Sequence, residues 1–231
     1  MNNTDIEKVN TFKFLGLALD TNIKWKTHTQ NVASKICQIN GILKRMKYIF
    51  PQRVLLIIYN SLIEAYINYC LLLWGKSPGR VLSLQKRALR TISLSNYNSH
   101  TSPLFKTLGL LTVHDMYTLK LLRLYYKIKT LATPPYFKHF LDNYNHELLK
   151  MNEIKHNFRN RRIVIPLPKR EYLKRNAKIQ LEQLICKFDK DILDRVEHTN
   201  IYRYGKEIKL YFINKYTTKC NIKDCYVCEN T

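Results

Sequence analysis

The sequence contains little glycine and little proline. Its 231 residues include six glycines and seven prolines, while 45% of the residues are hydrophobic. Disordered and low-complexity chains show the opposite bias, so this composition indicates a folded chain with a core. The many Leu, Ile and Tyr residues favour helices, and the length suits one compact domain with an appendage or two small domains.

Acidic residues are scarce as well. The chain has 39 Lys and Arg residues against 17 Asp and Glu residues, which gives a formal net charge of +22. Repulsion of this size destabilises a compact chain unless an anionic partner compensates it. Between Asp20 and Asp115, thirteen basic residues accompany one acid, Glu64. We therefore predict nucleic acid as the partner. An anionic membrane surface ranks second from charge alone, and an ordinary basic surface is the alternative to both.

The sequence has no uninterrupted apolar run long enough to cross a membrane. The most apolar region, Val54–Trp74, contains Asn60, Glu64 and Asn68, whereas a membrane span needs about 20 mainly apolar residues. The first ten residues are polar and do not resemble a signal peptide. These observations remove the membrane from the expected partners.

The six cysteines do not show the spacing of a secreted disulfide framework. Cys37, Cys70 and Cys186 lie far apart within apolar helical stretches, where we expect buried free thiols. We therefore predict an intracellular protein, and the sequence does not distinguish the nucleus from the cytoplasm.

Apolar residues recur at helical spacing through most of the chain. This periodicity predicts helices at about 27–48, 51–74, 80–94, 113–131, 177–195 and 201–216. The helix at 51–74 is apolar nearly all round and is therefore expected to be the buried centre. A short strand is expected at 12–15, and Pro166 and Pro168 predict an extended segment near 160–168.

The predicted fold class is therefore mainly α. We expect a helical bundle with a small β element at the N-terminus and a short extended segment near 160–168. The chain divides into a β element at residues 1–25, a helical bundle at 26–142, and a basic C-terminal tail region at 143–231 that holds the extended segment and further helices.

Several motifs occur in the order found in one family of polymerases. Phe12–Asp20 reads FKFLGLALD, Leu84–Arg90 reads LQKRALR, and Pro103–Gly109 reads PLFKTLG. Through these motifs, residues 10 to 175 resemble the thumb and tail of reverse transcriptases from non-LTR retrotransposons, the jockey-like LINE type of transposable element. The resemblance implies a helical bundle that lies against the template–primer duplex of an RNA-directed DNA polymerase.

One departure from this family decides the expected activity. Reverse transcriptases hold two metal ions about 3.5–4 Å apart on palm aspartates, which include an Asp-Asp pair, and this sequence contains no such pair. The resemblance therefore implies a thumb fragment that binds nucleic acid and is not an enzyme by itself. The start at Met1 further suggests a truncated copy of an element.

The basic helices are the predicted contact surface for template–primer phosphates. Lys and Arg on an exposed helix face supply affinity without reading the base sequence. The selected residues are Lys44, Arg45, Lys47, Lys86, Arg87 and Arg90, together with Arg159, Arg161 and Arg162 from the tail. Arg87 and Arg90 are preferred because an i, i+3 pair shares one helix face. The alternative is that part of this set only solvates the bundle.

Aromatic residues near the N-terminus have two interpretations. The strand that contains Phe12 and Phe14 resembles the element next to the primer grip, so its rings could approach nucleic acid. Packing into the core is the favoured interpretation, as it is for Trp25 and Trp74.

A cysteine pattern at the C-terminus raises the question of a metal. Cys220, Cys225 and Cys228 follow a Cys-x4-Cys-x2-Cys spacing, and Cys-x2-Cys is typical of a zinc half-site. A fourth ligand is missing nearby, so we expect no cofactor and keep zinc as the minor alternative.

The expected partners are nucleic acid, as an RNA–DNA hybrid or a DNA duplex, and a palm-containing polymerase chain. In the second case the fragment would be a protein-interaction remnant that acts in trans with a polymerase core. A non-functional product of a truncated element is the remaining alternative.

Overall fold

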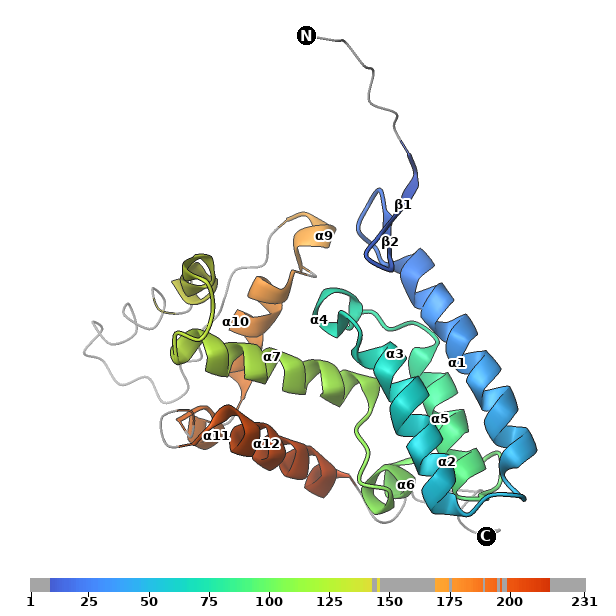
Figure 1. The fold of residues 1–231 in the computed structure, drawn as a ribbon. Helices are drawn as coiled ribbons and strands as arrows, with labels where there is room; N and C mark the ends of the chain where they lie inside the picture. Colours follow the sequence, from blue (N-terminus) through green and yellow to red (C-terminus); the bar gives the residue numbers. More distant parts are fainter. Residues whose placement is uncertain are drawn as a thin grey trace.

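The computed structural model describes residues 9–142, 145, 169–174, 176–188, 190–194, 196 and 199–216, and this part is mainly helical (Figure 1). The N-terminal elements are β1 (Thr11–Phe14), β2 (Leu17–Asp20), α1 (Lys26–Met46), α2 (Gln52–Ile58), the π-helical turn η1 (Tyr59–Glu64), α3 (Ala65–Asn68), α4 (Leu71–Trp74) and α5 (Val81–Ile92). They are followed by α6 (Ser102–Thr107), α7 (Val113–Lys129), the 3-10 helix η2 (Pro135–Leu141), α9 (Glu171–Lys174), α10 (Ala177–Lys187), α11 (Lys190–Asp194) and α12 (Ile201–Lys215). The expected mainly α fold with a small N-terminal β element is confirmed. The predicted extended segment near 160–168 lies outside the described residues.

The helices form two adjoining groups around one hydrophobic cluster. In Figure 1, α1 lies beside α5 and the segment from α2 to α3, while α7 extends away from them with α12 and α10 packed along it. The cluster joins both groups, since it contains Ile36 of α1, Leu89 of α5, Leu122 of α7 and Ile208 of α12. Burial of these apolar side chains is the main force that holds the two groups together. No helix in the described ranges is long and apolar enough to span a membrane.

The predicted N-terminal strand is one half of a hairpin. β1 pairs with β2 in an antiparallel manner, and the two turn residues, Leu15 (φ 45°) and Gly16 (φ 80°), both have positive φ angles. Two positive φ angles are characteristic of the type I′ turn, whose twist matches that of the flanking strands. The carboxylate of Asp20 accepts the N–H groups of Lys24 (2.6 Å) and Lys26 (3.2 Å). These bonds fix the hairpin at the beginning of α1.

The predicted continuous helix at 51–74 is interrupted, so this expectation was wrong. Its middle is the π-helical turn η1, and Cys70 adopts φ 48° between α3 and α4. The indole N–H of Trp74 donates to the carbonyl oxygen of Tyr69 at 2.9 Å, which holds α4 against the break.

The segment is also not buried all round. Tyr59 and Ile63 lie in the core, whereas an apolar stripe on another face is exposed. This exposed stripe consists of Leu62, Tyr66, Tyr69 and Leu73. The composition of the segment could not show this, because a helix that is apolar on every side still needs neighbours on every side to be buried.

The three described cysteines are free, but none of them is fully buried. Cys37 is exposed on α1, and Cys70 and Cys186 are half-buried. The expectation of buried thiols was therefore wrong for Cys37, which lies on the solvent side of an amphipathic helix.

The amide side chain of Gln85 connects three segments in the core. Its Nε2 group donates to the Tyr59 hydroxyl and to the Leu111 carbonyl oxygen, both at 2.8 Å. Its Oε1 atom accepts the N–H of Val113 at 3.0 Å. Gln85 thereby joins α5 to η1 and to the beginning of α7 at a fully buried position.

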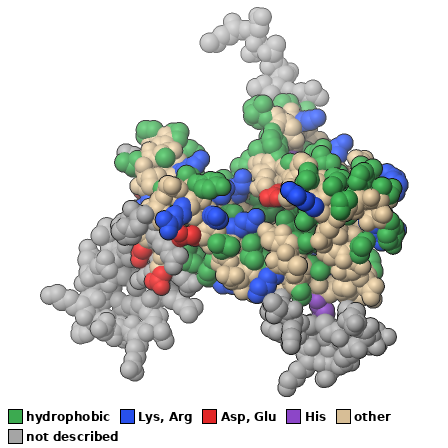
Figure 2. Space-filling view, turned by 60° about the horizontal axis from the view of Figure 1, so that its bottom comes forward, with side chains coloured by type: hydrophobic (Ala, Val, Ile, Leu, Met, Phe, Trp, Pro, Cys, Tyr) green, Lys and Arg blue, Asp and Glu red, His purple; other side chains and the backbone are tan. Residues whose placement is uncertain are grey.

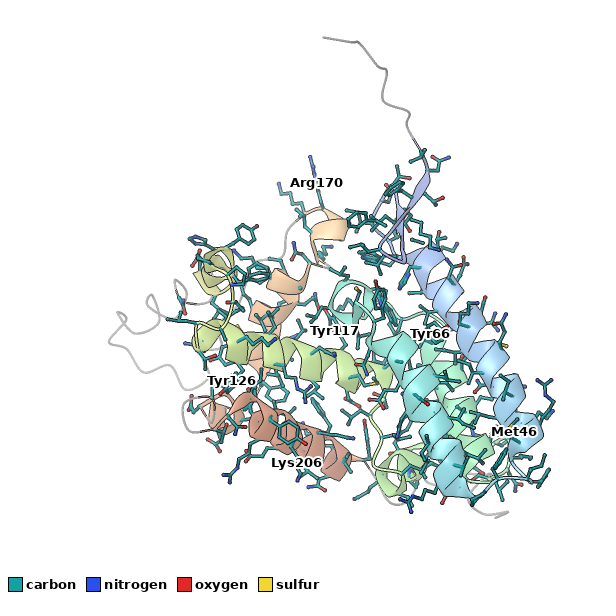
Figure 3. The ribbon with its side chains drawn as sticks, viewed as in Figure 1. Met46, Tyr66, Tyr117, Tyr126, Arg170 and Lys206 are labelled. Carbon is teal, nitrogen blue, oxygen red and sulfur yellow. The ribbon has the colours of Figure 1, made fainter. Side chains whose placement is uncertain are left out.

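Helices α7 and α12 are antiparallel and are tied at both ends. The Tyr216 hydroxyl accepts the N–H of Thr112 at 3.1 Å and donates to the carboxylate of Asp115, at the beginning of α7. At the other end, the Tyr126 hydroxyl donates to the Thr199 carbonyl oxygen at 2.6 Å. Figure 3 labels Tyr126 on α7 and Lys206 on α12.

We predict that Gln85→Leu lowers the free energy of unfolding by about 2–4 kcal/mol, because three buried polar groups would lose their partner. Urea unfolding followed by circular dichroism measures this change. The matched control is Gln38→Leu on the exposed side of α1, which should change stability by no more than about 0.5 kcal/mol. Equal stability of the two variants would contradict the structural role of Gln85.

Candidate nucleic-acid interface

Helices α1 and α5 run in the same direction, which brings their C-terminal ends together. A Cβ atom placed on Gly79, just before α5, would lie 3.8 Å from the Thr29 hydroxyl oxygen near the beginning of α1. Further along both helices, the Asn40 side-chain amide donates to the Leu84 carbonyl oxygen at 3.0 Å. The basic residues predicted on the two helices therefore lie at one shared end of the bundle (Figure 1).

Three of the predicted cations at this shared end are exposed and unpaired. Lys44 and Arg45 lie in the last turn of α1, and Arg87 lies on the outer side of α5. Within the part of the chain that the structure describes, none of the three side chains forms an ion pair. These side chains are free to contact an anion such as a phosphate group.

The other three predicted cations at this end, Lys47, Lys86 and Arg90, are half-buried. The Nε group of Arg90 donates to the Ser99 carbonyl oxygen at 2.8 Å, and burial lowers the pKa of its guanidinium group. The Lys47 ammonium group lies 4.5 Å from the centroid of the Tyr48 ring. Arg90 thus holds the loop after α5, so it is a weaker candidate for phosphate contact than Arg87, and the i, i+3 pair does not act as one surface.

Cations at this end also stabilise the helices themselves. Lys44 and Arg45 in the last turn of α1, and Arg90 in the last turn of α5, lie beside the negative ends of the helix dipoles. Such placement contributes about 0.3–1 kcal/mol per charge at an exposed site. This role needs no ligand, and it accounts for Lys44 and Arg45 but not for Arg87, which lies one turn earlier in α5.

Exposed aromatic rings accompany the cations. Tyr48 follows α1 and is 80% exposed, and Tyr97 lies in the loop after α5 and is 81% exposed. Tyr97 lies close enough to Arg90 to influence the pKa of the Arg90 guanidinium group. Bases of unpaired nucleotides stack on such rings. The sequence interpretation missed both tyrosines, although their position directly after basic helix ends was a usable signal.

A groove of about 740 Å³ lies between the hairpin, α1 and the segment from η1 to α3. Two exposed cations, Lys13 and Lys35, line it, and its lining residues include no acid. Tyr66 and Tyr69 from the exposed stripe form part of its wall, and Figure 3 labels Tyr66. The groove therefore combines positive charge with aromatic surface, which is the combination that suits single-stranded nucleic acid.

His28 is a buried histidine that lines this groove. Its side chain lies between the rings of Trp25 (6.3 Å between centroids) and Trp74 (5.7 Å), and it is 4% exposed. Its Nε2 atom has no hydrogen-bond partner among the described residues. Burial lowers the pKa of His28, so the imidazole is neutral at neutral pH.

The expected burial of the N-terminal aromatic residues is confirmed for the two tryptophans and wrong for the two phenylalanines. Trp25 and Trp74 are buried, which confirms their place in the core. Phe12 (57% exposed) and Phe14 (54% exposed) are not, so the favoured interpretation of these two residues was wrong. The hairpin projects from the beginning of α1, and only its second strand is buried in part, at Leu17 and Ala18.

The remaining predicted site residues lie outside the described residues. These are Arg159, Arg161 and Arg162 from the basic tail and Cys220, Cys225 and Cys228 from the zinc pattern. Among the described residues, no group of three or more His, Cys, Asp or Glu side chains is placed to hold a metal ion.

We predict that the free energy of unfolding falls as the pH is lowered through 6.5, the ordinary pKa of histidine. The unfolded chain takes up a proton at His28 in this range, whereas the folded chain does so only at lower pH, so acid favours unfolding. His28→Gln should remove this part of the pH dependence, measured as urea midpoints between pH 8 and pH 5. The exposed His114→Gln variant should keep it. An unchanged pH profile in His28→Gln would show that His28 does not titrate differently in the folded state.

Comparisons with models of protein families, with curated proteins and with solved structures found no match to this chain.

Proposed function

We propose that this chain is a nucleic-acid-binding, thumb-like part of a non-LTR retrotransposon reverse transcriptase that contacts the phosphates of a template–primer. The observation that carries the proposal is the shared end of α1 and α5, where Lys44, Arg45 and Arg87 are exposed and unpaired. The ordered motifs from Phe12 to Gly109 support the same assignment.

The contacts at this end are electrostatic and independent of base sequence. Lys and Arg side chains that reach phosphate oxygens displace condensed counterions, which supplies affinity that decreases with salt. The exposed rings of Tyr48 and Tyr97 add surfaces on which an unpaired base at a duplex end can stack. The proposed ligand is therefore an RNA–DNA hybrid or DNA duplex with a single-stranded extension.

Polymerisation belongs to another part of the enzyme in this proposal. Phosphoryl transfer by two metal ions requires carboxylates at short spacing, and the sequence has no Asp-Asp pair. The proposed thumb therefore acts together with a palm-containing polymerase core.

A second candidate function, binding to that polymerase core in trans, is favoured by a specific surface. Phe12 and Phe14 of the hairpin are exposed, and the Tyr69 hydroxyl donates to the Leu15 carbonyl oxygen, which joins the exposed stripe to the turn of the hairpin. An apolar surface of this kind is typical of a protein contact site.

We predict that the triple variant Lys44→Gln, Arg45→Gln and Arg87→Gln binds primer–template duplex more weakly than the wild type. Fluorescence anisotropy over a series of salt concentrations measures the affinity and its salt dependence. If all three cations contact phosphates, the slope of log K against log salt concentration should become shallower by up to about 3.

The matched control carries the same loss of charge elsewhere. It is Lys129→Gln, Lys187→Gln and Lys206→Gln, three exposed positions on α7, α10 and α12. This control should keep most of the affinity and the slope. Equal losses in both triple variants would mean that net charge, and not the shared end of α1 and α5, determines binding.

The second candidate function predicts that Phe12→Ser with Phe14→Ser lowers the affinity for a chain that contains the fingers and palm. Co-purification of this chain, followed by a titration of the two purified proteins, measures the effect. Exposed phenylalanines contribute little to folding, so both variant and wild type should show the same thermal unfolding. Unchanged affinity in the double variant would contradict a role of the hairpin in partner binding.

A further inference from the structure

Two neighbouring hollows lie along the packed helices α7 and α12. One has a volume of about 240 Å³ and reaches inward to Tyr59, Glu64 and Lys209. The other has a volume of about 430 Å³ and opens outward past Leu124 and Tyr202. Lys120 and Arg123 of α7 line both hollows, which places these two side chains between them. We name the pair of hollows the α7–α12 cavity.

The α7–α12 cavity concentrates positive charge. Lys120, Arg123, Lys127 and Lys209 line it, whereas Glu64 is the one acid in the lining of either hollow. Within the described parts of the chain, none of the four cationic side chains forms an ion pair or a hydrogen bond. Figure 2 shows Lys and Arg side chains gathered across the middle of the face turned towards the viewer, with few Asp or Glu side chains among them.

The neighbouring cations make the charged form of Lys120 less favourable. Burial lowers the pKa of Lys120, and the nearby charge of Arg123 and then that of Lys127 lower it further, while Glu64 acts in the opposite direction. An anion bound between these side chains would remove the repulsion, because it favours the charged form of each.

The guanidinium group of Arg123 packs directly against the backbone of α12 at Gly205. A Cβ atom on Gly205 would lie 2.5 Å from both Nε and Nη2 of Arg123, so a larger residue there would displace the guanidinium group. A glycine in a helix interior destabilises the helix relative to alanine, so Gly205 lowers the stability of α12. The Nε atom of Arg123 is excluded from solvent and has no described partner. Packing alone accounts for the glycine, but it leaves the Nε donor without a partner, and Glu64 is the one acid beside the four cations that line the two hollows.

The outer hollow has the surface that a planar ring requires. Leu72, Leu124 and Ile201 form apolar walls, and Tyr202 at the opening is 79% exposed. A phosphate chain would suit the basic side chains of the inner hollow, and an aromatic base would suit the apolar walls of the outer hollow. The volume of the outer hollow falls within the roughly 300–1,000 Å³ that small-molecule sites occupy.

We propose that the α7–α12 cavity binds a nucleotide, with its phosphates on Lys120 and Arg123 and its base against Tyr202 and Leu124. Lys127 and Lys209 flank the phosphates. The nucleotide is free in solution or forms the 5′ end of a strand, and the chemistry of recognition is the same for both. None of these residues belongs to the shared end of α1 and α5, so the two sites can be tested separately.

Isothermal titration calorimetry of the full chain with ATP, adenosine and inorganic triphosphate tests this proposal. We expect saturable ATP binding and no binding of adenosine at the same millimolar concentrations. Lys120→Gln with Arg123→Gln should weaken ATP binding by about tenfold or more, and Lys129→Gln, an exposed control on the same helix, should leave it unchanged. Tyr202→Ala should weaken the binding of ATP but not that of inorganic triphosphate.

Two further comparisons keep the test decisive. If the double variant does not fold, Lys209→Gln and Tyr202→Ala, both at exposed positions, replace it and should each weaken ATP binding. A 5′-triphosphorylated single-stranded oligonucleotide that binds more tightly than ATP would assign the site to a strand end, and weaker binding would assign it to free nucleotide. The triple variant at Lys44, Arg45 and Arg87 should bind ATP like the wild type, which separates this site from the duplex-binding surface.

Three results would overturn the proposal. The first is the absence of saturable ATP binding by the wild type. The second is equal ATP affinity in the cavity variants and in Lys129→Gln. The third is inorganic triphosphate that binds as tightly as ATP while Tyr202→Ala changes neither, since the cavity would then bind a bare polyanion and not a nucleotide.

Discussion

Gln85 is fully buried in α5, and its side-chain amide is hydrogen-bonded to the Tyr59 hydroxyl, the Leu111 carbonyl oxygen and the Val113 N–H. A buried amide is stable only when its donors and acceptor are satisfied, so these bonds fix the rotation and the height of α5 relative to η1 and α7. The residue before Gln85, Leu84, accepts a hydrogen bond at its carbonyl oxygen from the side-chain amide of Asn40, which fixes α5 against α1. The position of Arg87 beside the end of α1 follows from these contacts, and so does the place where α7 begins.

The surfaces that result are chemically distinct. The shared end of α1 and α5 carries unpaired cations with exposed tyrosines, and the hairpin with the exposed stripe presents apolar and aromatic side chains next to Lys13 and Lys35. The α7–α12 cavity is basic inside and apolar at its opening. A formal net charge of +22 destabilises a compact chain through repulsion, and in the described part of the chain the shared end of α1 and α5 and the α7–α12 cavity both carry cations without ion pairs. Duplex binding and polymerase contact would then use different faces of one bundle.

Helical periodicity was sufficient to predict α1, α5, α7 and α12, because each buries one face against its neighbours and shows it in the spacing of Leu, Ile and Val. The break at Cys70 could not be predicted in this way. No glycine or proline marks it, and the contact that accompanies the positive φ there, the hydrogen bond from the Trp74 indole to the Tyr69 carbonyl oxygen, leaves no trace in the hydrophobic periodicity.

In the candidate sites too, residues on periodic helices could be predicted, whereas contacts that depend on how the chain folds could not. Lys44, Arg45 and Arg87 could be predicted because they lie on the polar sides of strongly periodic helices. Arg90 shows the same pattern in sequence, yet its contact with Ser99 depends on how the following loop folds back. The α7–α12 cavity brings Glu64, Lys120 and Lys209 together from distant parts of the chain. Only the packing of three helices shows that they share one surface, and local spacing carries no information about it.

The central claim is that nucleic acid lies against the shared end of α1 and α5. Site-specific photo-cross-linking tests it most directly, with benzoylphenylalanine placed at position 87 or, for comparison, at the exposed position 129 of α7. The account predicts that primer–template duplex cross-links to position 87 and that added salt abolishes the product. Cross-linking that is as strong from position 129 as from position 87 would contradict it.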